Sequence, residues 1–178
     1  MEYQDLMATF CRQAEAMGAR VLRVTNSKEL AGQVVASLRP LGSRVALAAS
    51  TLAETAGLAA ALEQADFQVE RGGPEFARQA DSGIVEFDLG IAETGTLVHD
   101  ATDLKTRLAS MLPLACLALL PAERLVADMA GVLASYANRG PWPGYLAFVT
   151  GPSRTADIER SLTIGVHGPE RLLIALVG

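Results

Sequence analysis

The chain of 178 residues has few of the residues that build disulfide frameworks or metal centres. It contains two cysteines and two histidines. Cys11 and Cys116 form no CxxC pair, and no histidine pair lies near either of them. A disulfide framework, a structural zinc site and an iron–sulfur cluster would each need more ligands than these. We therefore predict two buried thiols in a reducing cytoplasm and no cofactor held by this chain.

Basic charge and long apolar runs are also scarce. The net charge is −5, and no run of lysine or arginine supplies the basic face that would neutralise nucleic-acid phosphates. The longest apolar stretches, such as 112–121, are too short to cross a bilayer. The acidic start at residues 1–5 lacks the basic and apolar parts of a signal peptide. These features predict a cytoplasmic protein without a membrane span or a nucleic-acid partner.

What the chain does have is apolar material in the amount that one domain needs. Half of its residues are hydrophobic, and the 20% that are charged are scattered rather than grouped. A length near ~150 residues is typical of a single domain with one core. The scattered charge and the high hydrophobic content exclude a disordered chain. With no internal repeat or linker, we expect one domain over residues 1–178.

The hydrophobic pattern alternates between helical and strand-like segments. Apolar residues recur at spacings of three and four in helical segments, and short apolar runs mark buried strands. Asn26 with Glu29, and Thr51 with Glu54, have the spacing of capping boxes. This alternation predicts an α/β fold with a largely parallel sheet, in which ligands bind at the carboxyl ends of the strands. The predicted helices are 3–17, 30–38, 51–62 and 125–136, and the predicted strands are 19–24, 44–48, 67–70, short runs within 83–98, 114–120, 145–150 and 172–177.

A first candidate segment for chemistry is the run from Glu93 to Thr96. Glu93 is a single carboxylate that can act as a nucleophile, a general base or a ligand anchor. Gly95 allows the backbone to approach a ligand, and Thr94 and Thr96 add hydroxyl groups. The alternative is a β-turn that carries a solvated acid.

A second candidate segment spans residues 150–159. A strand is followed by Gly151 and then by Ser153, Arg154 and Thr155, which is the pattern of a helix N-terminus. Free backbone N–H groups there bind anions, and Arg154 can close over a carboxylate or phosphate. The alternative is an ordinary capped helix whose acidic first turn complements the helix dipole.

A third candidate segment is the loop 165–169, which holds one of the two histidines. His167 is flanked by glycine, so its ring can stay exposed and shuttle a proton near neutral pH. Gly168 allows a ligand to approach the backbone. The alternative is a loop histidine that binds a backbone carbonyl. His99, at a predicted strand end, carries a weaker signal.

Arg107 stands before a buried strand, where a guanidinium can bind a carboxylate. The alternative is a pairing with a structural acid. No GxGxxG, Walker A or GxSxG element is present, so the common signatures of nucleotide sites and hydrolases are missing.

Taken together, four segments resemble the LUD-domain family, and within it the lactate utilisation protein C group. The resemblance runs from about Leu6 to the C-terminus. One departure is visible, because relatives often place a histidine after Leu112-Pro113, where this chain has Leu114 to Cys116. The segments that carry the resemblance are 91–97, Arg107 with Leu112-Pro113, 150–159 and 165–169.

The resemblance implies a three-layer α/β/α sandwich similar to the NagB, RpiA and CoA-transferase group. It also implies a place in bacterial oxidation of L-lactate to pyruvate, beside two partner proteins that carry iron–sulfur clusters. This chain resembles the subunit without clusters, and the leading hypothesis is an accessory or small-acid-binding subunit of lactate oxidation. On this view Glu93 or His167 assists proton movement, and the ligand-binding residues are Thr94, Gly95, Thr96, Arg107, Gly151, Ser153, Arg154, Thr155 and Gly168.

Two other functions remain open at this stage. CoA transferases of similar fold use a glutamate beside a glycine to attack a thioester, and Glu93 with Gly95 resembles that arrangement. An acyl-transfer enzyme with Glu93 as the nucleophile is therefore one alternative. A subunit that only binds other proteins is the second.

Overall fold

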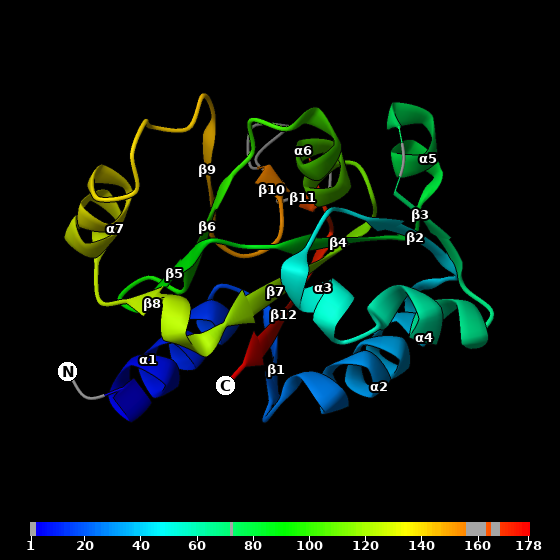
Figure 1. Ribbon diagram of the computed structural model, residues 1–178, viewed down its shortest axis with the longest axis horizontal. Coiled ribbons are helices and arrows are strands. Elements are labelled where there is room, and N and C mark those ends of the chain that lie inside the picture. The colour runs from blue at the N-terminus through cyan, green and yellow to red at the C-terminus, as the bar shows by residue number, and fades with distance from the viewer. Residues whose placement is uncertain (1–2, 72, 156–162, 165–167) are drawn as a thin grey trace.

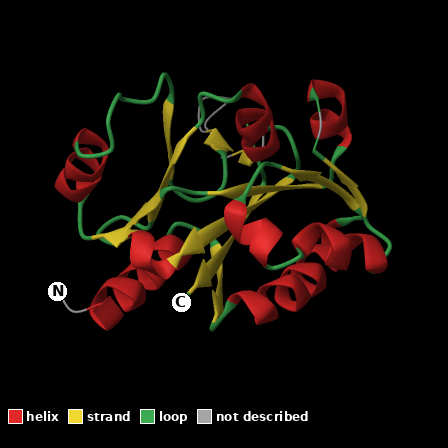
Figure 2. Ribbon diagram, viewed as in Figure 1, coloured by secondary structure: helices red, strands yellow, loops and turns green. Residues whose placement is uncertain are grey.

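The computed structural model describes residues 3–71, 73–155, 163–164 and 168–178. In this part of the chain, six strands form a main sheet in which all neighbouring strands are parallel (Figures 1 and 2). The predicted α/β class with a largely parallel sheet is confirmed. From one edge to the other, the strands are β1 (Arg20–Val24), β12 (Arg171–Val177), β7 (Ala115–Pro121), β4 (Ser82–Glu86), β2 (Arg44–Leu47) and β3 (Gln68–Glu70).

Helices cover both faces of the main sheet, which gives the expected three layers. Successive residues of a strand point to opposite faces, so Leu117 and Leu119 of β7 pack on one side and Ala118 and Leu120 on the other. A strand buried on both faces must be apolar throughout, as β7 is. The first face carries α2 (Ser27–Leu38), α3 (Thr51–Thr55) and α4 (Leu58–Gln64), and the second carries α1 (Tyr3–Ala16), α5 (Pro74–Gln79) and α6 (Leu104–Met111).

A small sheet packs beside the second face, and its central strands are buried on both sides. Leu97 points into the core shared with α1, whereas Val98 packs against Val132 and Tyr136 of α7 (Met129–Ala137). Its strands, in order, are β8 (Leu125–Val126), β5 (Leu89–Ile91), β6 (Thr96–Asp100) and β9 (Leu146–Val149), with only the β8–β5 pair parallel. The remaining elements are the strand pair β10 (Arg154–Thr155) and β11 (Thr163–Ile164) and the short helices Arg39–Leu41 and Ala122–Arg124. Among the described helices, none has the length and apolarity to cross a membrane.

Helix starts follow the capping signals in the sequence, with two shifts. The Asn26 side chain accepts hydrogen bonds from the N–H groups of Lys28 and Glu29, as predicted. Ser50, not Thr51, caps α3 by accepting from the N–H of Ala53. The predicted helix 51–62 is broken because Gly57 adopts a left-handed φ of 60° between α3 and α4.

The first residues of two predicted helices form strands instead, although α7 confirms the rest of the helix predicted at 125–136. Leu125 and Val126 pair with β5, and helix α7 begins only after the cap at Asp128. A short apolar run fits a helix or a strand equally well, so only the partner strand decides. The helix expected to begin at residues 153–155 is absent there, because Arg154 and Thr155 pair with β11. The rest of that segment, 156–162, lies outside the described residues.

Candidate functional site

A cavity of about 400 Å³ lies between α6, the small sheet and the main sheet. We call it the α6 cavity. Cys116 and Leu172, near the amino ends of β7 and β12, contribute to its wall. Burial raises the pKa of the Cys116 thiol to about 12, so this thiol is neutral at physiological pH. The cavity does not lie at the carboxyl ends of the parallel strands, where the sequence analysis had placed the ligand.

The α6 cavity nevertheless brings together five residues that the sequence analysis singled out as ligand-binding. Arg107 comes from α6, and the others come from the loops around β10 and before β12. Residues that are far apart in the sequence thus line the same cavity. The five are Arg107, Gly151, Ser153, Arg154 and Gly168.

Arg107 is the half-buried cation of this cavity. Its guanidinium carbon lies 5.0 Å from the centre of the Tyr145 ring, and its Nη1 donates to the Ala101 carbonyl at 3.3 Å. A guanidinium has five N–H donors, so stacking and one hydrogen bond leave others for a ligand. Among the described residues, no carboxylate forms an ion pair with Arg107. The side chain is therefore held in place while its charge remains available.

Arg154 and Gly151 attach the cavity wall to α1. The Arg154 Nη2 donates to the Met17 carbonyl at 2.7 Å, just beyond the end of α1. Gly151 has φ 70°, and a Cβ there would lie 2.3 Å from the same carbonyl oxygen. Gly151 is therefore required by contact with the chain itself. Arg154 is exposed and partly committed to α1, so Arg107 is the better placed of the two to hold an anion.

His99 also lines the cavity, and its ring is 1% exposed. The ring centre lies 4.4 Å from that of Phe87, and within the described structure neither ring nitrogen has a hydrogen-bond partner. Burial lowers the pKa of His99, and the nearby Asp88 and Asp100 only partly oppose this effect. In the sequence His99 carries a weaker signal than His167, which lies outside the described residues.

The buried ring makes stability depend on pH in a defined direction. The unfolded chain binds a proton on His99 near pH 6.5, whereas the folded chain resists protonation. The free energy of unfolding should thus fall as the pH drops through about 6.5. Urea unfolding from pH 8 to pH 5.5 should show a smaller fall for His99→Leu than for the wild type, since His167 is common to both. If the free energy of unfolding falls equally with pH in both proteins, His99 is not the group responsible.

The Glu93 segment lies away from the α6 cavity. Glu93 is exposed in the turn between β5 and β6, and its N–H donates to the Ala127 carbonyl at 3.0 Å. Gly95, with φ 66°, faces α1, because a Cβ there would lie 2.3 Å from the Ala14 nitrogen. The hydroxyl of Thr96 bonds to those of Thr94 at 2.7 Å and Thr150 at 2.8 Å. Of this group only Thr150 lines the cavity, so Thr96 supports its wall from behind.

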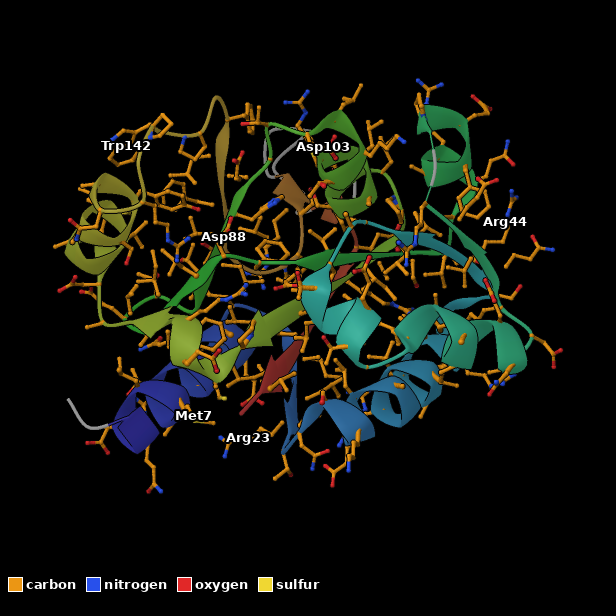
Figure 3. The ribbon with its side chains drawn as sticks, viewed as in Figure 1. Met7, Arg23, Arg44, Asp88, Asp103 and Trp142 are labelled. Carbon is orange, nitrogen blue, oxygen red and sulfur yellow. The ribbon has the colours of Figure 1, made fainter. Side chains whose placement is uncertain are left out.

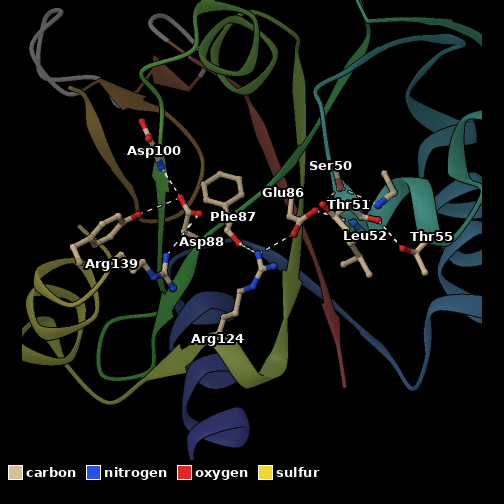
Figure 4. A network of polar contacts seen from close by, with 12 residues as sticks. Ser50, Thr51, Leu52, Thr55, Glu86, Phe87, Asp88, Asp100, Arg124 and Arg139 are labelled. Carbon is tan, nitrogen blue, oxygen red and sulfur yellow. Dashed lines mark hydrogen bonds and ion pairs between the residues drawn. The ribbon is translucent and has the colours of Figure 1, made fainter. Parts of the chain in front are cut away.

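A polar network that the sequence analysis missed lies at the carboxyl ends of β2, β4 and β7 (Figure 4). The Glu86 carboxylate accepts from the Ser50 hydroxyl at 2.6 Å and from the Leu52 N–H at 2.9 Å. It also pairs with Arg124 at 2.8 Å. Burial raises the pKa of Glu86, but the Ser50, Leu52 and Arg124 contacts outweigh it and hold that pKa below its ordinary value. We call these four residues the Glu86 network.

Two residues further on, Asp88 joins the small sheet to α7. Its carboxylate accepts from the Asp100 N–H at 2.6 Å and from the Tyr136 hydroxyl at 3.1 Å. Figure 3 shows Asp88 where the small sheet meets the main sheet. Two acids spaced by two residues after the buried run Gly83–Val85 were the signal in the sequence for this polar edge. In the described part of the chain, no cluster of histidine, cysteine and acidic residues could hold a metal ion.

Comparisons with known proteins match this fold and nearly all of the chain. The family model of the LUD domain matches residues 7–177. A lactate utilization protein C from Shouchella clausii is 41% identical over 53% of this chain and 43% of its own length. One from Anoxybacillus flavithermus is 35% identical over 82% of this chain and 68% of its own length. The chain spans about half the length of most of these relatives.

A solved structure shares the fold. The crystal structure of a DUF162 family protein from Deinococcus radiodurans superimposes with a TM-score of 0.67 at 20% identity. The alignment covers 100% of this chain and 99% of that one. At this identity the likeness concerns the fold alone.

Proposed function

Because this chain belongs to the LUD domain family, we propose that it is a cytoplasmic subunit of a system that oxidises L-lactate to pyruvate. In this proposal the chain itself holds no cluster, and iron–sulfur partner proteins carry the electrons. The names of its relatives support a role in lactate utilisation. The two buried, unpaired thiols suit a reducing compartment.

The chain's own part in this proposal is to bind a small carboxylate in the α6 cavity. The observation that carries it is Arg107, whose guanidinium is fixed by Tyr145 and Ala101 but pairs with no acid among the described residues. Ser153 and Arg154 add polar groups to the same wall. A carboxylate bound to a guanidinium forms charge-assisted hydrogen bonds, which are the strong ones in proteins.

Replacing Arg107 by alanine should weaken lactate and pyruvate binding by roughly 10- to 100-fold, since hydrogen bonds to charged groups contribute about 1.5–3 kcal/mol. Calorimetric titration of the purified protein with each acid measures this. Arg71→Ala is the matched control, because it removes the same charge from an exposed ion pair outside the cavity. Equal affinities for wild type and Arg107→Ala would refute the carboxylate site.

Acyl transfer by Glu93 has less support from the structure. An attacking carboxylate needs a pocket and donors for the oxyanion. Glu93 is exposed and does not line the α6 cavity. Treatment with acyl-CoA and then hydroxylamine would label Glu93 if it formed a thioester, and such labelling would promote this function over the first.

A further inference from the structure

The α6 cavity is lined by another polar side chain besides Arg107, and this one lacks a hydrogen-bond partner in the described structure. His99 is almost fully enclosed, lines the cavity and leaves both ring nitrogens without a partner in the described structure. The large majority of buried side-chain polar atoms in proteins are hydrogen-bonded. The ring nitrogens therefore lack a partner, and a ligand in the cavity that His99 lines would supply one when the ring turns toward it.

His99 and Arg107 are held next to the same short stretch of chain. His99 lies on β6, and the Ala101 carbonyl two residues later accepts the hydrogen bond from Arg107. The two side chains line one cavity from different elements, β6 and α6. The cation and the imidazole thus border the same cavity.

The lining also combines apolar side chains with the hydroxyl groups of Ser110, Thr150 and Ser153. Phe87, Ala147, Val149 and Leu172 all contribute carbon surface to the cavity. Such a lining suits a molecule with one anionic end, one further oxygen and a small apolar remainder.

We propose that His99 is the specificity-determining residue of this site and hydrogen-bonds the oxygen on the second carbon of a 2-hydroxy or 2-keto acid. This rests on the proposed function, because Arg107 must hold the acid's carboxylate. A neutral imidazole offers one donor and one acceptor nitrogen. A 2-hydroxyl group can use either nitrogen, and a keto oxygen uses the donor. A plain acid such as propionate satisfies neither and leaves the ring unpaired.

Titration of wild type and His99→Leu with L-lactate, pyruvate and propionate tests the proposal. The wild type should bind lactate and pyruvate about tenfold more tightly than propionate, as one hydrogen bond permits. His99→Leu should bind all three acids with similar affinity, at the propionate level of the wild type. A lactate preference retained in His99→Leu, or absent from the wild type, would overturn the assignment.

The outcomes separate this inference from the carboxylate site itself. If the wild type binds propionate as tightly as lactate, the Arg107 site stands and the role of His99 falls. If no acid binds, the proposed function fails and this inference falls with it.

Ring-nitrogen NMR of the wild type gives a second readout should the leucine variant fail to fold. The chain has only two histidines, His99 and His167, so the spectrum is simple to assign with His99→Asn. Lactate should shift the His99 ring signals, and propionate should not. Unchanged His99 signals at saturating lactate would mean that water holds the ring, and would overturn the proposal.

Discussion

Replacing Gly95 by alanine should lower the free energy of unfolding by about 3 kcal/mol, with no ligand present. A side chain in the left-handed region costs about 1–2 kcal/mol. In addition, the new Cβ would lie 2.3 Å from the nitrogen and 2.6 Å from the Cα of Ala14. The β5–β6 turn and α1 must then separate, and forced overpacking typically costs a further ~1–3 kcal/mol. Urea unfolding followed by circular dichroism measures the loss.

Gly57→Ala is the matched control for this variant. Gly57 has a φ of 60°, close to the 66° of Gly95, but no atom lies within 4 Å of its would-be Cβ. Gly57→Ala should therefore lower the free energy of unfolding only by the ~1–2 kcal/mol that a side chain costs in the left-handed region. The difference between the two variants isolates the contact with α1. Equal losses would show that Gly95 is needed for its backbone angle alone.

Glu86→Ala should destabilise the protein by about 3 kcal/mol. The side chain of Glu86 is 11% exposed and that of Arg124 is 34% exposed, so this ion pair is only partly hydrated. Its removal leaves the Ser50 hydroxyl and the Leu52 N–H without their acceptor, and leaves the half-buried Arg124 guanidinium with its hydrogen bond to the Phe87 carbonyl but without its ion pair. Loss of one partner of a buried pair typically costs ~3–5 kcal/mol, and the exposure of Arg124 places the value at the lower end. Chemical unfolding at pH 7 measures it.

Glu54→Ala provides the comparison for an exposed pair. Glu54 and Arg71 lie 3.2 Å apart with side chains 58% and 56% exposed. Such pairs contribute about 0–1 kcal/mol. If Glu54→Ala and Glu86→Ala lose the same stability, the Glu86 network does not join the ends of the strands as described.

The Glu86 contribution should also vanish in acid. Its folded-state pKa lies below the ordinary 4.5, so the stabilisation is present above that pH and is lost as the pH falls through the folded-state pKa. The difference in unfolding free energy between wild type and Glu86→Ala should therefore decrease below about pH 4.5. If this difference stays the same in acid, the stabilisation does not depend on the ionised form of Glu86.

The fold follows from the sequence because its strongest signals are local. The apolar runs of β7 and β12 and the cap at Asn26 identify their elements without knowledge of any partner. Where a tertiary partner decides whether a segment forms a helix or a strand, the local sequence pattern does not predict the outcome. Leu125 and Val126 join β5 instead of beginning a helix, and Arg154 pairs with β11 where the start of a helix was expected.

Part of the candidate site could be predicted from the sequence, since five of the proposed ligand-binding residues line one cavity, whereas the segment from Glu93 to Thr96 does not line it. Arg107 and Ser153 do line one cavity, as their motifs indicated. Gly95 and Gly151 were interpreted as places where a ligand approaches, yet both face α1 or the residue that follows it. A glycine in a motif indicates that another group comes close to the backbone, but not whether that group is a ligand or another part of the chain. His99 was undervalued because sequence cannot show that a ring is enclosed without a partner.

The strand order of the main sheet has a consequence for synthesis on the ribosome. β1 pairs only with β12 within the main sheet, and Val24 lies opposite Val177. The two strands are separated by roughly 150 residues, which take roughly 8 to 30 seconds to translate at ~5–20 residues per second. During that interval the edge of β1 that will face β12 stays unpaired, and unpaired strand edges can pair with the wrong strand. The nascent chain should accordingly depend on chaperones more than its modest length suggests.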